Sequence, residues 1–179
     1  MALLLRLPYM IFHTSNSLNI TQTSQPFPMK QHQKQTHLHF YFHDILSGRN
    51  PTTVKVVGQD YPNSTFGTVM MADDPLTDGP DRSSSKLIGR AQGMYAWAGH
   101  EVDFGFLMVM NLVFFEGEFN GSVLSLLGRN KLGPEREMPI VGGTGVFRFA
   151  TGYALGKPYW LDYAKGDATV EYDVFVLHY

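Results

Sequence analysis

A run of hydrophobic residues from Phe104 to Phe115 occupies both alternating sets of positions, so a β-strand here would be apolar on both faces. Four glycines lie in or just before this run: Gly89, Gly93, Gly99 and Gly105. Each would weaken a helix by roughly 1 kcal/mol relative to alanine, so strands are favoured over a buried helix. We therefore predict a β-hairpin over residues 87–115, whose second strand needs cover on each face.

The first strand of this hairpin has two different faces. One carries Gly89, Ala91, Gly93, Tyr95 and Trp97, and the other carries Arg90, Gln92 and Met94. Small residues followed by two large aromatic residues would make a shelf for a flat ligand, with Tyr95 and Trp97 as substrate contacts. The alternative is that the glycines only permit barrel curvature and the aromatic side chains only fill the core.

Residues 37–45 alternate between apolar and polar positions, as a half-buried strand does. Leu38, Phe40 and Phe42 share one face, and Asp44 is in phase with them. An unpaired carboxylate on an apolar face is costly, and burial should raise its pKa. Asp44 is therefore our candidate catalytic acid, with Phe42 as a neighbouring substrate contact. The alternative is that Asp44 lies at the strand end, where this face reaches water.

Three histidines occupy the other face of the same segment. His37, His39 and His43 have a spacing that resembles metal ligands on one strand, but no fourth ligand follows in a recognisable pattern. We expect no metal site.

Further segments rich in β-forming residues are separated by turns: 67–73, 119–127, 135–140, 146–155 and 167–179. In the last of them Tyr172 shares a face with Val170 and Val174, and is a further candidate substrate contact. We interpret 47–66 as turn-rich, 75–85 as a polar loop that covers a barrel mouth, 141–145 as a turn and 157–165 as a partly ordered return. These segments, with those above, predict an all-β, eight-stranded antiparallel up-and-down β-barrel, whose interior admits one small ligand.

Length and composition narrow the class of protein. Of the 179 residues, we assign 37–179 to one barrel domain and 1–36 to a signal-like or disordered leader, whose apolar patches are too short to span a bilayer. The chain has no cysteine, which excludes disulfides and thiol-based redox or zinc sites. A net charge of −2 offers no basic field for nucleic acid.

Three Asn-x-Ser/Thr triplets begin at Asn19, Asn63 and Asn120. Such triplets are glycosylation acceptors in secreted proteins, and we take Asn63 and Asn120 as candidate sites.

Four blocks resemble, in order and spacing, the signature blocks of the plant dirigent protein family: FYFHDI at 40–45, DDPLT at 73–77, GRAQG at 89–93 and VGGTG at 141–145. The resemblance covers about residues 37–179. It implies an allene-oxide-cyclase-like barrel, secretion to the extracellular apoplast, and a homo-oligomer that is commonly a trimer, with a dimer as the alternative.

The resemblance also implies a role in plant phenylpropanoid metabolism. Family members bind phenoxy radicals made by a separate oxidase, a laccase or peroxidase, and direct their stereoselective coupling to lignans, without redox activity or a cofactor of their own. Two positions depart from the lignan-forming pattern, because Val146 stands in place of an Asp and Thr151 in place of an Arg. Val146 is therefore a candidate substrate contact, and Arg148 could in part replace the missing cation as a catalytic residue.

Three functions remain open on these residues. The first is a dirigent protein that directs phenoxy-radical coupling without being an enzyme in its own right. The second is a dehydratase or cyclase of the pterocarpan-synthase kind, since segments 136–139 and 171–179 look like that broader branch, which closes a ring on a quinone-methide-like intermediate by loss of water from an isoflavanol. The third is a lipocalin-like carrier of small phenolics.

Overall fold

The structure is a computed structural model that describes residues 32–58, 65–100 and 104–179. These residues belong to a compact unit that spans Gln31–Tyr179. Within the described ranges the chain forms nine strands and two short 3₁₀ helices. They are β1 (Lys34–Asp44), β2 (Thr53–Val57), β3 (Val69–Thr77), β4 (Leu87–Trp97), β5 (Gly105–Phe114), η1 (Gly117–Phe119), β6 (Val123–Lys131), β7 (Arg136–Thr144), η2 (Gly145–Phe147), β8 (Thr151–Asp162) and β9 (Asp167–His178).

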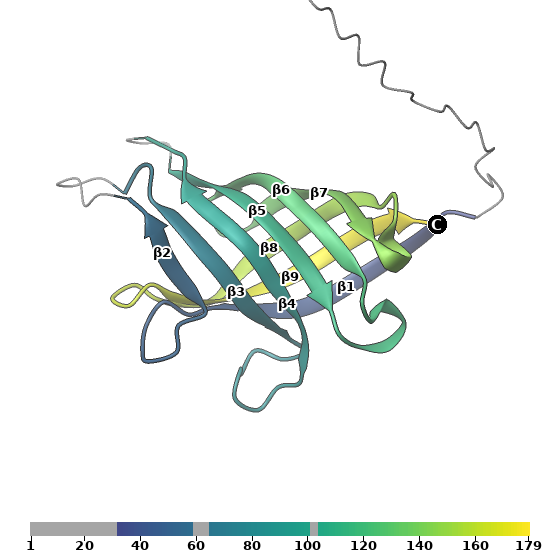
Figure 1. The fold of residues 1–179 in the computed structure, drawn as a ribbon, viewed down its shortest axis with the longest axis horizontal. Helices are drawn as coiled ribbons and strands as arrows, with labels where there is room; N and C mark the ends of the chain where they lie inside the picture. Colours follow the sequence, from purple (N-terminus) through teal and green to yellow (C-terminus); the bar gives the residue numbers. More distant parts are fainter. Residues whose placement is uncertain (1–31, 59–64, 101–103) are drawn as a thin grey trace, which may run out of the picture. The chain divides into compact units, whose positions relative to one another are not determined.

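Eight of these strands close into an antiparallel barrel, which confirms the predicted fold class (Figure 1). Neighbours in the sheet follow the order β1-β9-β8-β7-β6-β5-β4-β3-β2, and a short pairing of β1 with β3 closes the ring. The ninth strand, β2, pairs along β3 beside this closure. No helix in the described part of the chain is long and apolar enough to cross a membrane.

The barrel interior takes one parity from each strand. On β5 the side chains of Met108, Met110, Leu112 and Phe114 are buried inside, whereas Leu107 on the opposite face is 45% exposed. The predicted two faces of β4 are also observed, because Ala91 and Tyr95 are buried and Gln92 and Met94 are exposed. β4 and β5 thus form the predicted antiparallel pair.

Two glycines in β4 are required by the close approach of β5. A Cβ at Gly89 would lie 2.3 Å from the carbonyl oxygen of Val113, and one at Gly93 would lie 2.0 Å from that of Val109. Since no side chain tolerates such contacts, glycine at these two positions is what allows β4 to lie this close to β5. Tyr95 and Trp97, on the same strand, instead face the cavity described below.

One end of the barrel is filled by aromatic side chains. Phe147, with no exposed surface, packs edge-on against Phe114 and stacks on Phe119 at a centroid distance of 5.0 Å. The ring of His178 meets Phe147 edge-on as well. Aromatic rings thus pack closely at this end of the barrel.

Several strand boundaries differ from the prediction. The turn-rich interval 47–66 contains β2, β3 runs on to Thr77, and β6 is shifted to Val123–Lys131. The turn predicted at 141–145 is wrong, because β7 continues to Thr144 across a register shift opposite β6. The strand predicted over 146–155 is wrong at its start, where η2 turns the chain, and residues 157–162 belong to β8, with a register shift between Pro158 and Trp160.

Residues 75–85 were expected to cover the mouth of the barrel. The β3–β4 loop formed in this region does not cover the mouth of the cavity. It follows the end of β3 near Phe114, and none of its residues lines the cavity. It lies near His43, whose ring is buried and accepts or donates hydrogen bonds with Thr77 and Thr169. Burial and then the charge of Arg82 lower the pKa of His43 to about 4, so this histidine is neutral.

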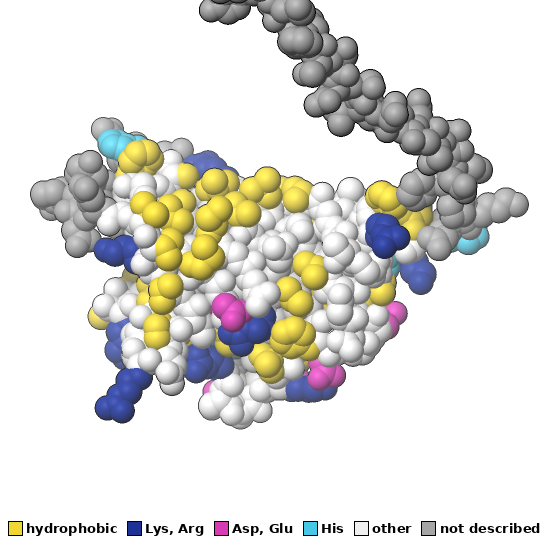
Figure 2. Space-filling view, in the orientation of Figure 1, with side chains coloured by type: hydrophobic (Ala, Val, Ile, Leu, Met, Phe, Trp, Pro, Cys, Tyr) yellow, Lys and Arg dark blue, Asp and Glu magenta, His cyan; other side chains and the backbone are white. Residues whose placement is uncertain are grey.

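The outer face of the barrel carries a row of apolar side chains. Met71, Met94, Val109 and Leu127 lie side by side in register on β3, β4, β5 and β6. Figure 2 shows hydrophobic side chains gathered on this face, over the front strands of Figure 1. Three of the four are more than 40% exposed in the single chain.

Candidate active site

A cavity of about 320 Å³ opens at the end of the barrel opposite the aromatic cluster. It lies where β1, β4, β6 and β8 end and where β5, β7 and β9 begin. Its wall is mostly aromatic and aliphatic, and the polar groups in it are few: Asp44, Asn130, Arg136, Asp162 and Asp167 together with the tyrosine hydroxyls of Tyr95, Tyr163 and Tyr172. An apolar cavity with few convergent polar groups is the usual form of a small-molecule site.

Asp44 is the last residue of β1 and points into this cavity. The Tyr95 hydroxyl donates a hydrogen bond to its Oδ2 at 2.9 Å, and its Oδ1 is buried without a partner. Burial is the main cause that raises the pKa of Asp44; the hydroxyls of Thr53 and Tyr95 act in the opposite direction, and the charge of Asp167 adds to the increase. Asp44 was expected either to be buried on the apolar face or to lie at a strand end. It lies at the end of β1 and is nevertheless largely removed from water.

Tyr95 is buried and remains a neutral hydrogen-bond donor. Burial and the neighbouring Asp44 raise the pKa of its hydroxyl far above the ordinary range. Its ring packs against Trp97 and Phe106, whose own rings meet edge-on at a centroid distance of 4.7 Å. These three rings make one wall of the cavity.

Arg136 and Asn130 form the cationic side of the cavity, and sequence reasoning missed both. Arg136 Nη1 donates to Asn130 Oδ1 at 3.5 Å, and Arg136 Nε is buried without a partner. Burial is the main cause that lowers the pKa of Arg136, whereas Tyr172 and Tyr163 favour its charge. Among the described residues, Arg136 Nε and Asp44 Oδ1 are the buried side-chain polar atoms that lack a partner.

Tyr172 and Phe42, the other candidate substrate contacts on β9 and β1, line the same cavity. Tyr172 stacks on Phe40 at 5.7 Å and lies tilted against Phe42 at 5.8 Å. Burial raises the pKa of Tyr172 to about 12, against the influence of Arg136. Its hydroxyl therefore stays neutral between the acidic and the cationic sides.

The rim of the cavity is held by Asp167, the first residue of β9. Its Oδ1 accepts the backbone N–H groups of Leu46 and Ser47 at 2.8 and 2.9 Å, and its Oδ2 accepts the Ser47 hydroxyl at 2.5 Å. These bonds fix the loop after β1, so that Leu46 contributes to the wall.

Comparison with known proteins decides the family. A model of the Dirigent-like protein family matches residues 35–177. The chain belongs to the dirigent family. It is 49% identical to pterocarpan synthase 1 of Glycyrrhiza echinata over 98% of this chain and 95% of that protein, and 52% identical to dirigent protein 11 of Arabidopsis thaliana over 98% and 94%. A solved pterocarpan synthase dirigent protein superimposes with a TM-score of 0.78 at 54% identity, covering 83% of this chain and 87% of that one.

Val146 and Arg148 are far from the cavity of this dirigent barrel. Both are exposed and lie in or just after η2, at the end of β7 opposite to Arg136. The Val146 carbonyl accepts a hydrogen bond from His178 Nδ1, and its N–H donates to Ser122 Oγ. Thr151, the other departure, begins β8 and is exposed as well. The structure thus brings Asp44, Phe42, Tyr95, Trp97 and Tyr172 together, but not these residues.

The remaining candidate sites lie on the surface or outside the described residues. Asn120 is exposed directly after η1, whereas Asn63 lies outside the described residues. His37 and His39 both contact Asp173 Oδ1, at 2.7 and 3.0 Å, on the outer face of β1 and β9. In the described ranges, no group of three or more His, Asp or Glu side chains is arranged to hold a metal ion.

Proposed function

We propose that this dirigent-family protein is a dehydrating cyclase, and that its cavity holds one isoflavanol molecule between Asp44 and Arg136. The observation that carries the proposal is an acid and a cation that face one aromatic-lined cavity, each with a buried atom that lacks a partner. Buried polar groups are nearly always paired, so two such atoms in one cavity favour a ligand that pairs them. The names of two relatives, both pterocarpan synthases, support the same reaction class.

The reaction needs a proton at the leaving hydroxyl. In the proposed step Asp44 donates its proton to this hydroxyl, the C–O bond breaks, and its electron pair leaves with water. The cation that remains is delocalised over the phenolic ring as a quinone-methide-like intermediate. A second phenolic hydroxyl then attacks the same carbon, the new C–O bond closes the ring, and the released proton returns to the Asp44 carboxylate. Asp44 thus acts first as general acid and then as general base.

The other side chains position the substrate. Tyr95 donates to Asp44 Oδ2 and so orients the carboxyl. Arg136 and Asn130 present donors on the far side, where they would hold a phenolic oxygen of the substrate. The rings of Trp97 and Phe106 offer faces and edges to a flat aromatic substrate.

The volume of the cavity favours one substrate molecule over two. Small-molecule sites run from about 300 to 1,000 Å³, and this cavity, at about 320 Å³, is at the lower limit. Stereoselective coupling of two phenoxy radicals, supplied by a separate laccase or peroxidase, is the second candidate, favoured by the aromatic wall. It would need both radicals to share this volume or to meet at its mouth.

One assay separates these functions. Purified protein is incubated with a racemic isoflavanol alone, and in parallel with coniferyl alcohol and a laccase, and products are resolved by chiral chromatography. The cyclase predicts enantiomerically enriched ring-closed product from the first mixture without an oxidase. Enriched lignan from the second mixture alone would instead favour radical coupling. Tight binding of either phenol with racemic product throughout would leave a carrier.

We further propose that the protein is secreted to the apoplast and assembles as a homo-oligomer, a trimer by the family resemblance. The apolar row of Met71, Met94, Val109 and Leu127 supports assembly. Burial of a fully exposed side chain of this kind is worth about 1.5–3 kcal/mol, and each of these gains the part that corresponds to its exposed fraction. A second copy of the chain presenting the same row would cover it.

A further inference from the structure

A second carboxyl, Asp74, lies behind Asp44 and has no role in the steps above. It belongs to the inward face of β3 and has no exposed surface. The register of β1 with β3, Tyr41 opposite Thr77 and Phe42 opposite Leu76, brings Asp44 opposite Asp74 when it is continued by two residues. Two buried carboxyls in adjacent positions are costly if both are charged.

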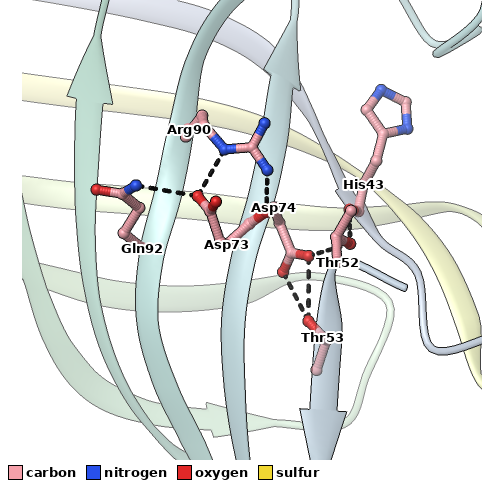
Figure 3. Close-up of polar contacts among 7 residues, drawn as sticks. All are labelled: His43, Thr52, Thr53, Asp73, Asp74, Arg90 and Gln92. Carbon is pink, nitrogen blue, oxygen red and sulfur yellow. Dashed lines mark hydrogen bonds and ion pairs between the residues drawn. The ribbon is translucent and has the colours of Figure 1, made fainter. Parts of the chain in front are cut away.

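Asp74 is surrounded by hydroxyl donors from the chain that leads into β2. Thr52 Oγ1 donates to Asp74 Oδ1 at 2.5 Å, and Thr53 Oγ1 lies 3.1 and 3.2 Å from the two carboxyl oxygens (Figure 3). Thr52 also binds the backbone on both sides of Asp44, since its hydroxyl accepts the Ile45 N–H and contacts the His43 carbonyl. The placement of Asp44 and the environment of Asp74 are thus built by the same two threonines.

The Thr53 hydroxyl is shared between the two carboxyls. It donates to Asp74 in this structure, yet it is close enough to Asp44 to lower the pKa of that group. A proton on the unpartnered Oδ1 of Asp44 would find an acceptor in Thr53 Oγ while Thr53 donates to Asp74. Without substrate, this one proton pairs both carboxyls; a substrate hydroxyl bound in the cavity would take the place of Thr53 as the acceptor.

We propose that Asp74 is a positioning residue for Asp44: the two carboxyls, joined through the Thr53 hydroxyl, hold one proton between them and keep an acid available at the cavity wall. The proposal rests on the dehydrating cyclisation inferred above, for which Asp44 must begin protonated. Asp74 acts through Asp44 and does not touch the substrate.

The charges around the pair favour retention of this proton. Burial first, and then the charge of Asp44, raise the pKa of Asp74 to about 7, against the hydrogen bonds of Thr52 and Thr53. The titratable groups that face the pair are Tyr95 from β4 and Asp167 and Tyr172 from β9, and the charge of Arg90 acts on Asp74 from the outer face of β4. Of these Arg90 alone is a cation, and it is engaged on the outer face by Asp73.

The test compares Asp74→Asn with Asp73→Asn in the full chain. Asp73 is the next residue, but its carboxylate is exposed and binds Arg90 and Gln92 on the outside (Figure 3). The two buried carboxyls repel each other when both are charged, and this raises the pH at which the pair loses its proton. In Asp74→Asn, Asp44 titrates without this partner and should lose its proton at lower pH. We expect the alkaline limb of the pH–kcat profile for isoflavanol cyclisation to move down by at least about one pH unit in Asp74→Asn, with KM little changed and with the Asp73→Asn profile unaltered.

Thr53→Val provides a second variant whose effect has the opposite sign. Loss of its hydroxyl removes a hydrogen bond that lowers the pKa of both carboxyls, so the alkaline limb should move to higher pH. A purely structural role would not shift the limb in opposite directions in two variants. An unshifted alkaline limb in Asp74→Asn, or equal downward shifts in both variants, would overturn the proposal. If Asp74→Asn does not fold, the direction in which the limb shifts in Thr53→Val decides the test: an upward shift supports the proposal and a downward shift overturns it.

Infrared spectroscopy tests the pair without any substrate. The wild-type protein should show a protonated-carboxyl band that disappears as pH rises through about 7, and this band should be absent or shifted to lower pH in Asp74→Asn and in Asp44→Asn but retained in Asp73→Asn. If the band titrates in this way but the protein converts no isoflavanol, proton sharing between Asp44 and Asp74 is supported and only the proposed reaction is ruled out. A wild-type protein without the band overturns the pair itself.

Discussion

The two ends of the barrel are built from the same alternating strands, but they treat their polar groups differently. At the closed end the buried polar groups next to Phe147 are paired: His178 Nε2 with Thr36 at 2.8 Å, His178 Nδ1 with the Val146 carbonyl at 3.1 Å, and Ser122 Oγ with the Val146 N–H. At the open end Asp44 Oδ1 and Arg136 Nε have no partner. The closed end is therefore organised for stability, and the open end retains unsatisfied groups that a ligand can pair.

The largest expected effect comes from the open end. Asp44→Asn keeps the volume of the side chain and can still accept the Tyr95 hydroxyl, but it has no proton to donate. We expect the rate of isoflavanol cyclisation to fall by about 10²- to 10⁴-fold, with a thermal midpoint no lower than that of the wild type. Steady-state kinetics and calorimetry measure the two quantities. Retention of the wild-type rate would show that Asp44 is structural.

The closed end should respond in the opposite way. Phe147→Ala removes a fully buried ring and should lower the free energy of unfolding by about 3–5 kcal/mol, while the kcat of the folded fraction stays near the wild-type value. Urea denaturation and active-site titration provide these numbers. Val141→Ala, at a side chain that is 54% exposed, is the matched control and should change stability by about 0.5 kcal/mol or less. A large loss of kcat in folded Phe147→Ala would mean that the two ends are coupled.

The outer face extends the comparison to assembly. Met94 and Leu177 are 41% and 40% exposed, but Met94 lies in the apolar row and Leu177 lies on β9. Met94→Lys should weaken self-association by about 10- to 100-fold, whereas Leu177→Lys should leave the oligomer intact. Light scattering coupled to size-exclusion chromatography measures both. A wild-type protein that is monomeric at micromolar concentration would contradict the proposed assembly.

The smallest effect is expected at the two departures from the lignan-forming pattern. Val146 and Thr151 are exposed at the closed end, so the double change Val146→Asp with Thr151→Arg should alter product ratios by less than about twofold, in both the cyclisation and the radical-coupling assay. Product ratios from chiral chromatography decide this. A clear change in selectivity would mean that this end contacts substrate or substrate-bound subunits.

Strand alternation predicted much of the candidate site because the direction of a side chain from a strand is a local property. Asp44 is in phase with Phe42, and Tyr95 with Trp97, in the sequence itself, so each pair was placed on one face before the fold was known. Arg136 and Asn130 were not predicted, because the same local pattern is weak at the ends of strands. Arg136 is the first residue of β7 and Asn130 lies near the end of β6, where the alternation has too few positions on one side to be read.

The sequence by itself determined that this chain forms an antiparallel barrel, because the apolar period of two recurs between turn residues in almost every strand, and it determined the family through four blocks of residues. Only the tertiary structure decided which face of β5 is inside, since both faces are apolar and packing alone distinguishes them. It also decided the pairing of Asp44 with Tyr95 and the position of Asp74 behind Asp44, more than 25 residues away in the chain. Contacts of that kind depend on strand register and barrel closure, which no local pattern encodes.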